Sequence, residues 1–116
     1  MKVIIAGSRT FSDYQLLKDY CDHVLQNTDE VEIVSGGAAG ADRLGERYAK
    51  EKGYPVAHFP ALWDTFGKGA GYIRNREMAY YADALIAFWD GVSPGTKSMI
   101  KLAKEFDLEI KIKIYE

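Results

Sequence analysis

The sequence has almost no cysteine, no long apolar run and no excess of either charge. Its one cysteine, Cys21, cannot close a disulfide within the chain, and the lack of paired cysteines and histidines predicts no metal site. No apolar run reaches the roughly 20 residues of a membrane span. The apolar start, residues 1–6, meets polar residues too soon for a signal peptide. We therefore expect a cytoplasmic protein without a membrane partner.

The charge is nearly balanced, with 15 basic against 17 acidic residues and a formal net charge of −2. Proteins that coat nucleic acid are strongly basic, so this balance argues against nucleic acid as a partner. What the chain does have is 47% hydrophobic residues within 116 positions, which is enough for a core. This length predicts one domain, residues 1–116.

Short apolar runs alternate with segments of helical period, which is typical of βαβ units. Strands are expected at 3–6, 31–35, 55–59, 84–89 and 110–114. This order predicts an α/β, Rossmann-like doubly wound sheet of about five parallel strands with helices on both faces. The usual order of such a sheet places its first and fourth strands side by side at the centre.

Smaller signals refine this topology. Pro55 predicts an edge position for the third strand, and the lysines that alternate with isoleucines in 110–114 predict an outer strand. Ser12 with Gln15 matches a capping box at the start of the first helix. Cys21 falls on the apolar face of that helix and is expected in the core.

Three glycine-bearing turns follow strands that should end at one edge of the sheet: residues 7–9, 35–40 and 89–96. Ligands of doubly wound sheets bind beyond the carboxyl ends of the strands, where the winding reverses. The convergence of these turns is the main functional signal in the sequence.

The turn that ends at Asp42 is made almost entirely of small residues. Its backbone could approach a phosphate and offer unpaired N–H groups, although tight packing of strand on helix also requires glycine. The spacing is not G-x-G-x-x-G, so no dinucleotide, and no other cofactor, is expected. Asp42 either caps the helix or contacts a polar ligand. The candidate ligand-binding residues of this turn are Ser35, Gly36, Gly37, Gly40 and Asp42.

The turn before the last helix resembles a P-loop but has Thr96 where the second glycine belongs, which argues against a triphosphatase. We expect a second anion-binding turn, and the alternative is an ordinary proline-glycine turn with Thr96 as the helix N-cap. The candidates here are Asp90, Gly91, Ser93, Gly95 and Thr96.

Basic residues complete the predicted crevice. Arg9, whose fork suits phosphate, follows the central strand. Arg74 and Asn75 are expected in the first turn of a helix over 72–82, where a cation opposes the macrodipole by about 0.3–1 kcal/mol unless an anion is bound. Trp63, Phe66 and Trp89 could stack on a base or could pack as ordinary apolar residues. The remaining candidates are Gly7, Ser8, Trp63, Lys68, Arg74 and Asn75.

The stretches AGSRTF, VSGGAAGADRLGERYA, GKGAGYIRNREM and ADALIAFWDGVSPGT resemble the SLOG superfamily of Rossmann-like proteins, and most closely its small stand-alone YspA-like branch. The resemblance implies binding or sensing of a nucleotide or nucleotide-derived, ribose-phosphate ligand. Dimers are common among relatives of this kind, so the resemblance leaves a homodimer open.

The superfamily that these motifs resemble includes enzymes, the phosphoribohydrolases, also called lysine decarboxylase-like proteins. These enzymes cleave the base from a nucleoside 5′-monophosphate. Arg74 matches their arginine, but Met99 stands in the place of their glutamate. Methionine cannot move a proton or stabilise a cationic centre. Binding is therefore the leading expectation. The alternatives are a phosphoribohydrolase that uses Arg74 with an unknown carboxylate, and a structural domain without a ligand.

Overall fold

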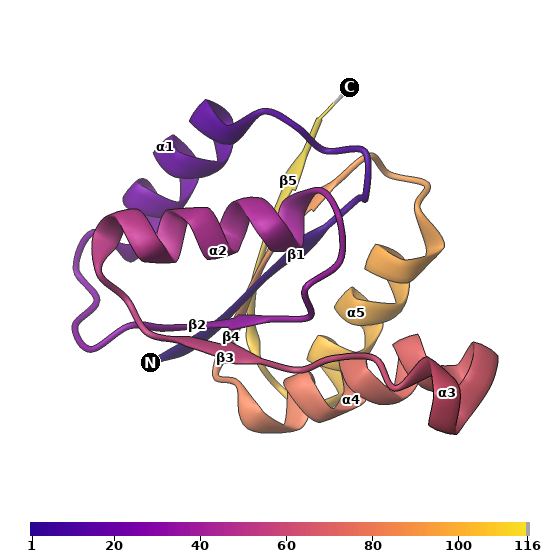
Figure 1. Cartoon of the computed structure of the whole chain (residues 1–116). Helices are drawn as coiled ribbons and strands as arrows, with labels where there is room; N and C mark the ends of the chain where they lie inside the picture. Colours follow the sequence, from indigo (N-terminus) through magenta and orange to yellow (C-terminus); the bar gives the residue numbers. More distant parts are fainter. Residues whose placement is uncertain (116) are drawn as a thin grey trace.

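A computed structural model describes residues 1–115 and contains one sheet of five parallel strands in the order β3-β2-β1-β4-β5 (Figure 1). The α/β doubly wound fold is thereby confirmed. The elements are β1 (Lys2–Gly7), α1 (Tyr14–Leu25), β2 (Glu32–Ser35), α2 (Ala41–Lys52), β3 (Val56–His58), α3 (Trp63–Phe66), the 3₁₀ helix η1 (Gly67–Gly69), α4 (Ala70–Tyr81), β4 (Ala84–Trp89), α5 (Pro94–Glu105) and β5 (Glu109–Ile114).

The first and fourth strands pair at the centre, as predicted, with Ile4 beside Leu85 and Gly7 beside Phe88. Residues 3–6 of β1 are all buried, which is the pattern of a parallel strand covered on both faces. Strands β3 and β5 lie at the two edges, so both edge predictions are confirmed.

Alternate residues of the strands face two separate layers of helices. Val3 and Ile5 pack in one core cluster with residues of α1 and α2, whereas Ile4 packs in the other with residues of α4 and α5. Figure 1 shows these two pairs of helices on opposite sides of the sheet. Cys21 is fully buried in the first cluster, which confirms its predicted place in the core.

Two predicted helix boundaries and one alternative are wrong. The first helix is capped by Asp13, whose Oδ1 accepts from Leu16 N at 3.0 Å, and not by Ser12. Helix α4 begins at Ala70 and follows two short helices in a region expected to be irregular. Helix α5 begins at Pro94 after an N-cap at Ser93, so Thr96 lies inside the helix and is not its cap.

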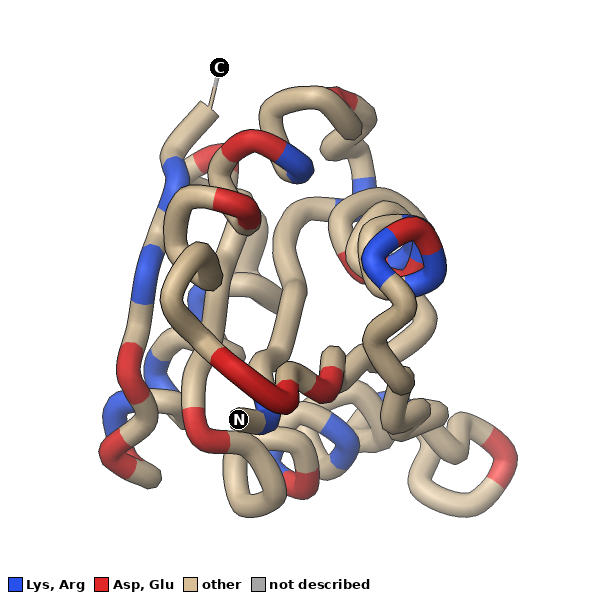
Figure 2. The backbone as a smooth tube through the Cα atoms, turned by 90° about the vertical axis from the view of Figure 1, so that its left-hand side faces the viewer, with Lys and Arg blue, Asp and Glu red and all other residues tan. Residues whose placement is uncertain are grey.

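Two surface features bear on possible partners. Within residues 1–115, no helix combines the length and the apolar character needed to cross a bilayer. Basic and acidic residues are interleaved along the face that Figure 2 displays, so neither sign dominates it.

Candidate functional site

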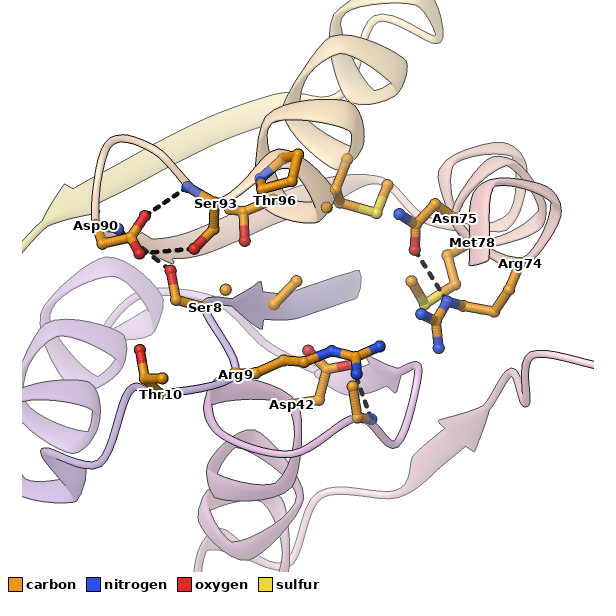
Figure 3. A pocket seen from close by; sticks show the side chains of 16 residues that line it. Ser8, Arg9, Thr10, Asp42, Arg74, Asn75, Met78, Asp90, Ser93 and Thr96 are labelled. Carbon is orange, nitrogen blue, oxygen red and sulfur yellow. Dashed lines mark hydrogen bonds between the residues drawn. The ribbon is translucent and has the colours of Figure 1, made fainter. Parts of the chain in front are cut away.

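A cavity of about 470 Å³ opens at the carboxyl ends of β1 and β4 (Figure 3). The chain leaves β1 toward α1 on one face of the sheet and leaves β4 toward α5 on the other, so the cavity lies where the winding reverses. Its lining comprises Ala6, Gly7, Ser8, Arg9, Thr10, Ala38, Asp42, Arg74, Asn75, Met78, Asp90, Ser93, Pro94, Gly95, Thr96 and Met99.

The N-terminus of α5 forms one wall of this cavity. Gly95 and Thr96 lie in the first turn, where backbone N–H groups have no carbonyl of the same helix to bond. The positive end of the helix dipole therefore faces the cavity. Thr96 is 5% exposed, and Figure 3 shows its hydroxyl directed into the cavity. This wall can accept an anion.

Asp90 holds the loop that leads into α5. Its carboxylate accepts from Val92 N at 2.9 Å, from Ser93 N at 2.7 Å and from Ser93 Oγ at 2.6 Å, while Asp90 N donates to Ser8 Oγ at 3.3 Å. The hydrogen bonds from Ser93 and Val92 lower the pKa of Asp90 to about 2. Asp90 is therefore ionised and stabilises this loop through its hydrogen bonds, and it is poorly suited to transfer a proton.

Arg74 reaches the cavity from α4 and is held by two hydrogen bonds. Its Nη1 donates to Gly36 O at 2.7 Å, and its Nε donates to Asn75 Oδ1 at 2.9 Å. Burial lowers the pKa of Arg74. Because α4 begins at Ala70, Arg74 and Asn75 lie in its second turn, and the predicted conflict with the helix dipole is wrong. A guanidinium has five N–H groups, so Arg74 keeps donors for a ligand.

Asp42 lies opposite Arg74 with only 6% of its surface exposed. Its Oδ2 accepts from Ala38 N at 3.2 Å. Burial raises the pKa of Asp42 to about 6, although the Ala38 N–H and the charges of Arg74 and Arg9 act in the opposite direction. Figure 3 shows Arg9, Arg74 and Asp42 at one end of the cavity, so this end contains two cations and one weakly acidic carboxyl group.

The glycine-rich turn between β2 and α2 contributes less lining than its sequence suggests. Gly37 N donates to Ser35 Oγ at 3.1 Å and Ala38 N donates to Asp42, so these amides are already bonded. A Cβ on Gly36 would lie 2.4 Å from Arg74 Nη1, and one on Gly40 would lie 2.3 Å from Ser8 O. Close packing, the alternative considered above, therefore accounts for both glycines.

The structure brings part of the predicted set together. The predicted residues that line the cavity are Gly7, Ser8, Arg9, Asp42, Arg74, Asn75, Asp90, Ser93, Gly95 and Thr96. Those that lie outside the lining are Ser35, Gly36, Gly37, Gly40, Trp63, Lys68 and Gly91. Trp63 and Lys68 are exposed on α3 and η1, and Trp89 instead donates from Nε1 to Ser93 O at 3.1 Å.

Several lining residues were not predicted from the sequence. Thr10 directly follows the predicted Arg9, and its hydroxyl was a visible candidate. Met78 lies four residues after Arg74, a spacing that places both on one helix face. Ala6, Ala38 and Pro94 carry no chemistry that a sequence pattern would single out.

The fold and the position of the cavity define a Rossmann-like protein with its candidate site at the reversal point of the sheet. The sequence model of the YspA, cpYpsA-related SLOG family matches residues 1–66, more than half of the chain. The Gene 61 protein of Mycobacterium phage D29 is 33% identical over 94% of this chain and 93% of its own length. The chain belongs to this SLOG family, as its sequence motifs predicted.

A solved structure with the same fold is that of DNA processing protein A from Helicobacter pylori, which binds single-stranded DNA. The two structures agree with a TM-score of 0.77 at 20% identity, over all of this chain and 66% of the other. The charge argument against nucleic acid as a partner is therefore wrong, because a protein of this fold binds single-stranded DNA. A net charge of −2 is a property of the whole chain, and it says nothing of cations gathered in one cavity.

Proposed function

We propose that the cavity binds the phosphate group of a nucleotide or nucleotide-derived ligand. The observation that carries this proposal is the convergence of Arg9, Arg74 and the N-terminus of α5 on one cavity at the reversal point of the sheet. A helix N-terminus attracts anions through its free amides and dipole. Arginine adds planar, charged donors that suit phosphate oxygens.

Groups at both ends of the cavity would contact the phosphate. Gly95 N, Thr96 N and the Thr96 hydroxyl would donate to phosphate oxygens at the α5 wall. Arg74 and Arg9 would neutralise the charge from the other side. The Asn75 amide uses its oxygen for Arg74 Nε, and its nitrogen remains a donor for a sugar or base.

Binding without cleavage is favoured by the side chains near the proposed phosphate. Met99, which the sequence resemblance aligns with the glutamate of the phosphoribohydrolases, lines the cavity, and the carboxylate of Asp90 is engaged by its own loop. The environment of Asp42 favours hydrolysis as a second candidate function. Its buried carboxyl group, with a pKa of about 6, lies beside Arg74 and has an acidity suited to general acid–base work.

Calorimetric titration with adenosine 5′-monophosphate and other nucleotides tests the binding proposal. Arg74→Ala should weaken binding about 10- to 150-fold, the range for a lost hydrogen bond to a charged group. Arg76→Ala is the matched control, because Arg76 lies on the same helix over the Phe106 ring and does not line the cavity. Equal affinities for the two variants would remove Arg74 from the site.

Free base released from a bound monophosphate would separate hydrolysis from binding. The wild type and Asp42→Asn should be incubated with each nucleotide that binds, and the products separated chromatographically. Binding without release by either protein supports the leading proposal. Release that disappears in Asp42→Asn would establish the second candidate instead.

A further inference from the structure

The cavity lacks a surface on which a nucleobase could stack. No aromatic ring is among its lining residues in the described part of the chain, and its larger apolar side chains are Met78, Pro94 and Met99. A nucleotide held there by its phosphate gains little from base stacking. Three exposed rings lie instead on α3 and in the first turn of α4.

We define the aromatic rim as Trp63, Phe66 and Tyr72, which are 51%, 44% and 52% exposed. All of residues 62–69 are exposed, and none of α3 is buried. Rings left in water to this degree are not explained by the packing of this chain. Lys68, on η1, falls between Phe66 and Tyr72 in the sequence and is exposed as well.

Trp63 of the rim packs against the helix that brings Arg74 and Asn75 to the cavity wall. A Cβ built on Gly71 would lie 3.5 Å from the indole tip of Trp63, so this ring rests against the first turn of α4. Arg74 and Asn75 follow Gly71 by three and four residues and therefore share its helix face. Along the axis of α4, Gly71 is separated from these two residues by one turn, about 5.4 Å. Adjacent nucleotides of a single strand can span such a step.

We infer that the ligand is a single-stranded nucleic acid, with one phosphate in the cavity and the neighbouring base stacked on Trp63. Cationic groups that hold the backbone, beside aromatic rings that stack successive bases, are the usual means of binding a single strand. Lys68 is exposed on η1, directly after α3, where it can meet a second phosphate. This inference rests on the proposed phosphate site and names the class of ligand that occupies it.

A ladder of thymidine ligands tests the inference: the 5′-monophosphate and its 5′-phosphorylated di- and tetranucleotides, at one salt concentration. Affinity for the wild type should rise from one to two nucleotides, and the fluorescence of Trp63 should be quenched by the longer ligands only. Trp63→Ala should lose about 5- to 150-fold in affinity for the dinucleotide, the range of one stacked base, and keep its affinity for the monophosphate. Trp63→Phe should recover part of the loss.

Tyr80→Ala is the matched control, since Tyr80 is an aromatic residue of α4 that is 81% exposed and does not line the cavity. Its affinities should equal those of the wild type. Equal losses for both ligands in Trp63→Ala would overturn the inference, because Trp63 would then cover a mononucleotide. Unchanged dinucleotide affinity would overturn it too. Both results leave the proposed function standing if Arg74→Ala still weakens binding, whereas no binding of any ligand in the ladder by the wild type refutes the two together.

Discussion

The carboxyl group of Asp42 gives the clearest quantitative prediction, because it is buried in a cavity that it shares with two arginines. Burial raises its pKa from 3.8 to about 6, so the folded protein holds this proton more tightly than the unfolded chain does. The contribution of Asp42 to stability is therefore fully present below about pH 4 and is lost as the pH rises through about 6. The wild type should become less stable with increasing pH in this window.

The size of the effect follows from the same values. A pKa change from 3.8 to about 6 corresponds to about 3 kcal/mol in the free energy of unfolding. About 1.4 kcal/mol of this falls between pH 5 and pH 8. Asp22, Asp90 and Glu51 have lowered pKa values, so their contributions change at more acidic pH and leave this window largely to Asp42.

Urea unfolding at pH 5, 6, 7 and 8 measures this dependence. Asp42→Asn keeps an oxygen that can accept from Ala38 N and removes the charge, so its stability should change little across the range. Asp90→Asn is the control: it should lower stability through its loop, but its slope with pH should match that of the wild type. Identical slopes for the wild type and Asp42→Asn would refute the assignment of this pH dependence to Asp42.

Three glycine substitutions give further predictions. Urea unfolding measures the stability of each variant, and titration with sulfate, used in place of phosphate, measures anion binding. Gly40→Ala should lose at least about 1–3 kcal/mol of stability, because its φ is +80° and the new Cβ would lie 2.3 Å from Ser8 O. Gly95→Ala should gain roughly 0.5–1 kcal/mol, since nothing lies within 4 Å and alanine favours a helix; a loss would contradict the open space seen there. Gly36→Ala should stay folded but bind sulfate about tenfold or more weakly, because the new methyl displaces the Arg74 guanidinium. Unchanged sulfate binding by Gly36→Ala would show that the position of Arg74 does not matter.

The sheet could be predicted from the sequence because the strands carry their own signals. The unbroken apolar run of β1 indicates burial on both faces, and the lysines of β5 indicate an edge. The start of α4 could not be predicted in this way. Residues 67–71 contain three glycines, which disfavour helix, but burial of Ala70 to 1% exposure fixes the segment against the core. Tertiary packing overrode the local preference there.

The candidate site, too, could be predicted from the sequence only in part. Its position followed from topology, since turns after adjacent parallel strands must meet at one edge of the sheet. Which residues of those turns line the cavity depends on hydrogen bonds that no spacing reveals. Ser35 and Asp42 take up the amides of Gly37 and Ala38, and this leaves the α5 wall with the free donors.

The packing role of the glycine-rich turn accounts for how the cations come together. The missing side chain of Gly36 lets Arg74 Nη1 approach Gly36 O to 2.7 Å, and this bond directs the guanidinium toward the cavity. The missing side chain of Gly40 lets the turn that carries Ser8 and Arg9 lie against the start of α2. The turn would therefore promote anion binding mainly by positioning Arg74 on one side and Arg9 on the other, and only slightly by direct contact with the anion. For this reason a loss of binding on substitution of either glycine does not by itself indicate contact with the ligand, and stability must be measured beside affinity.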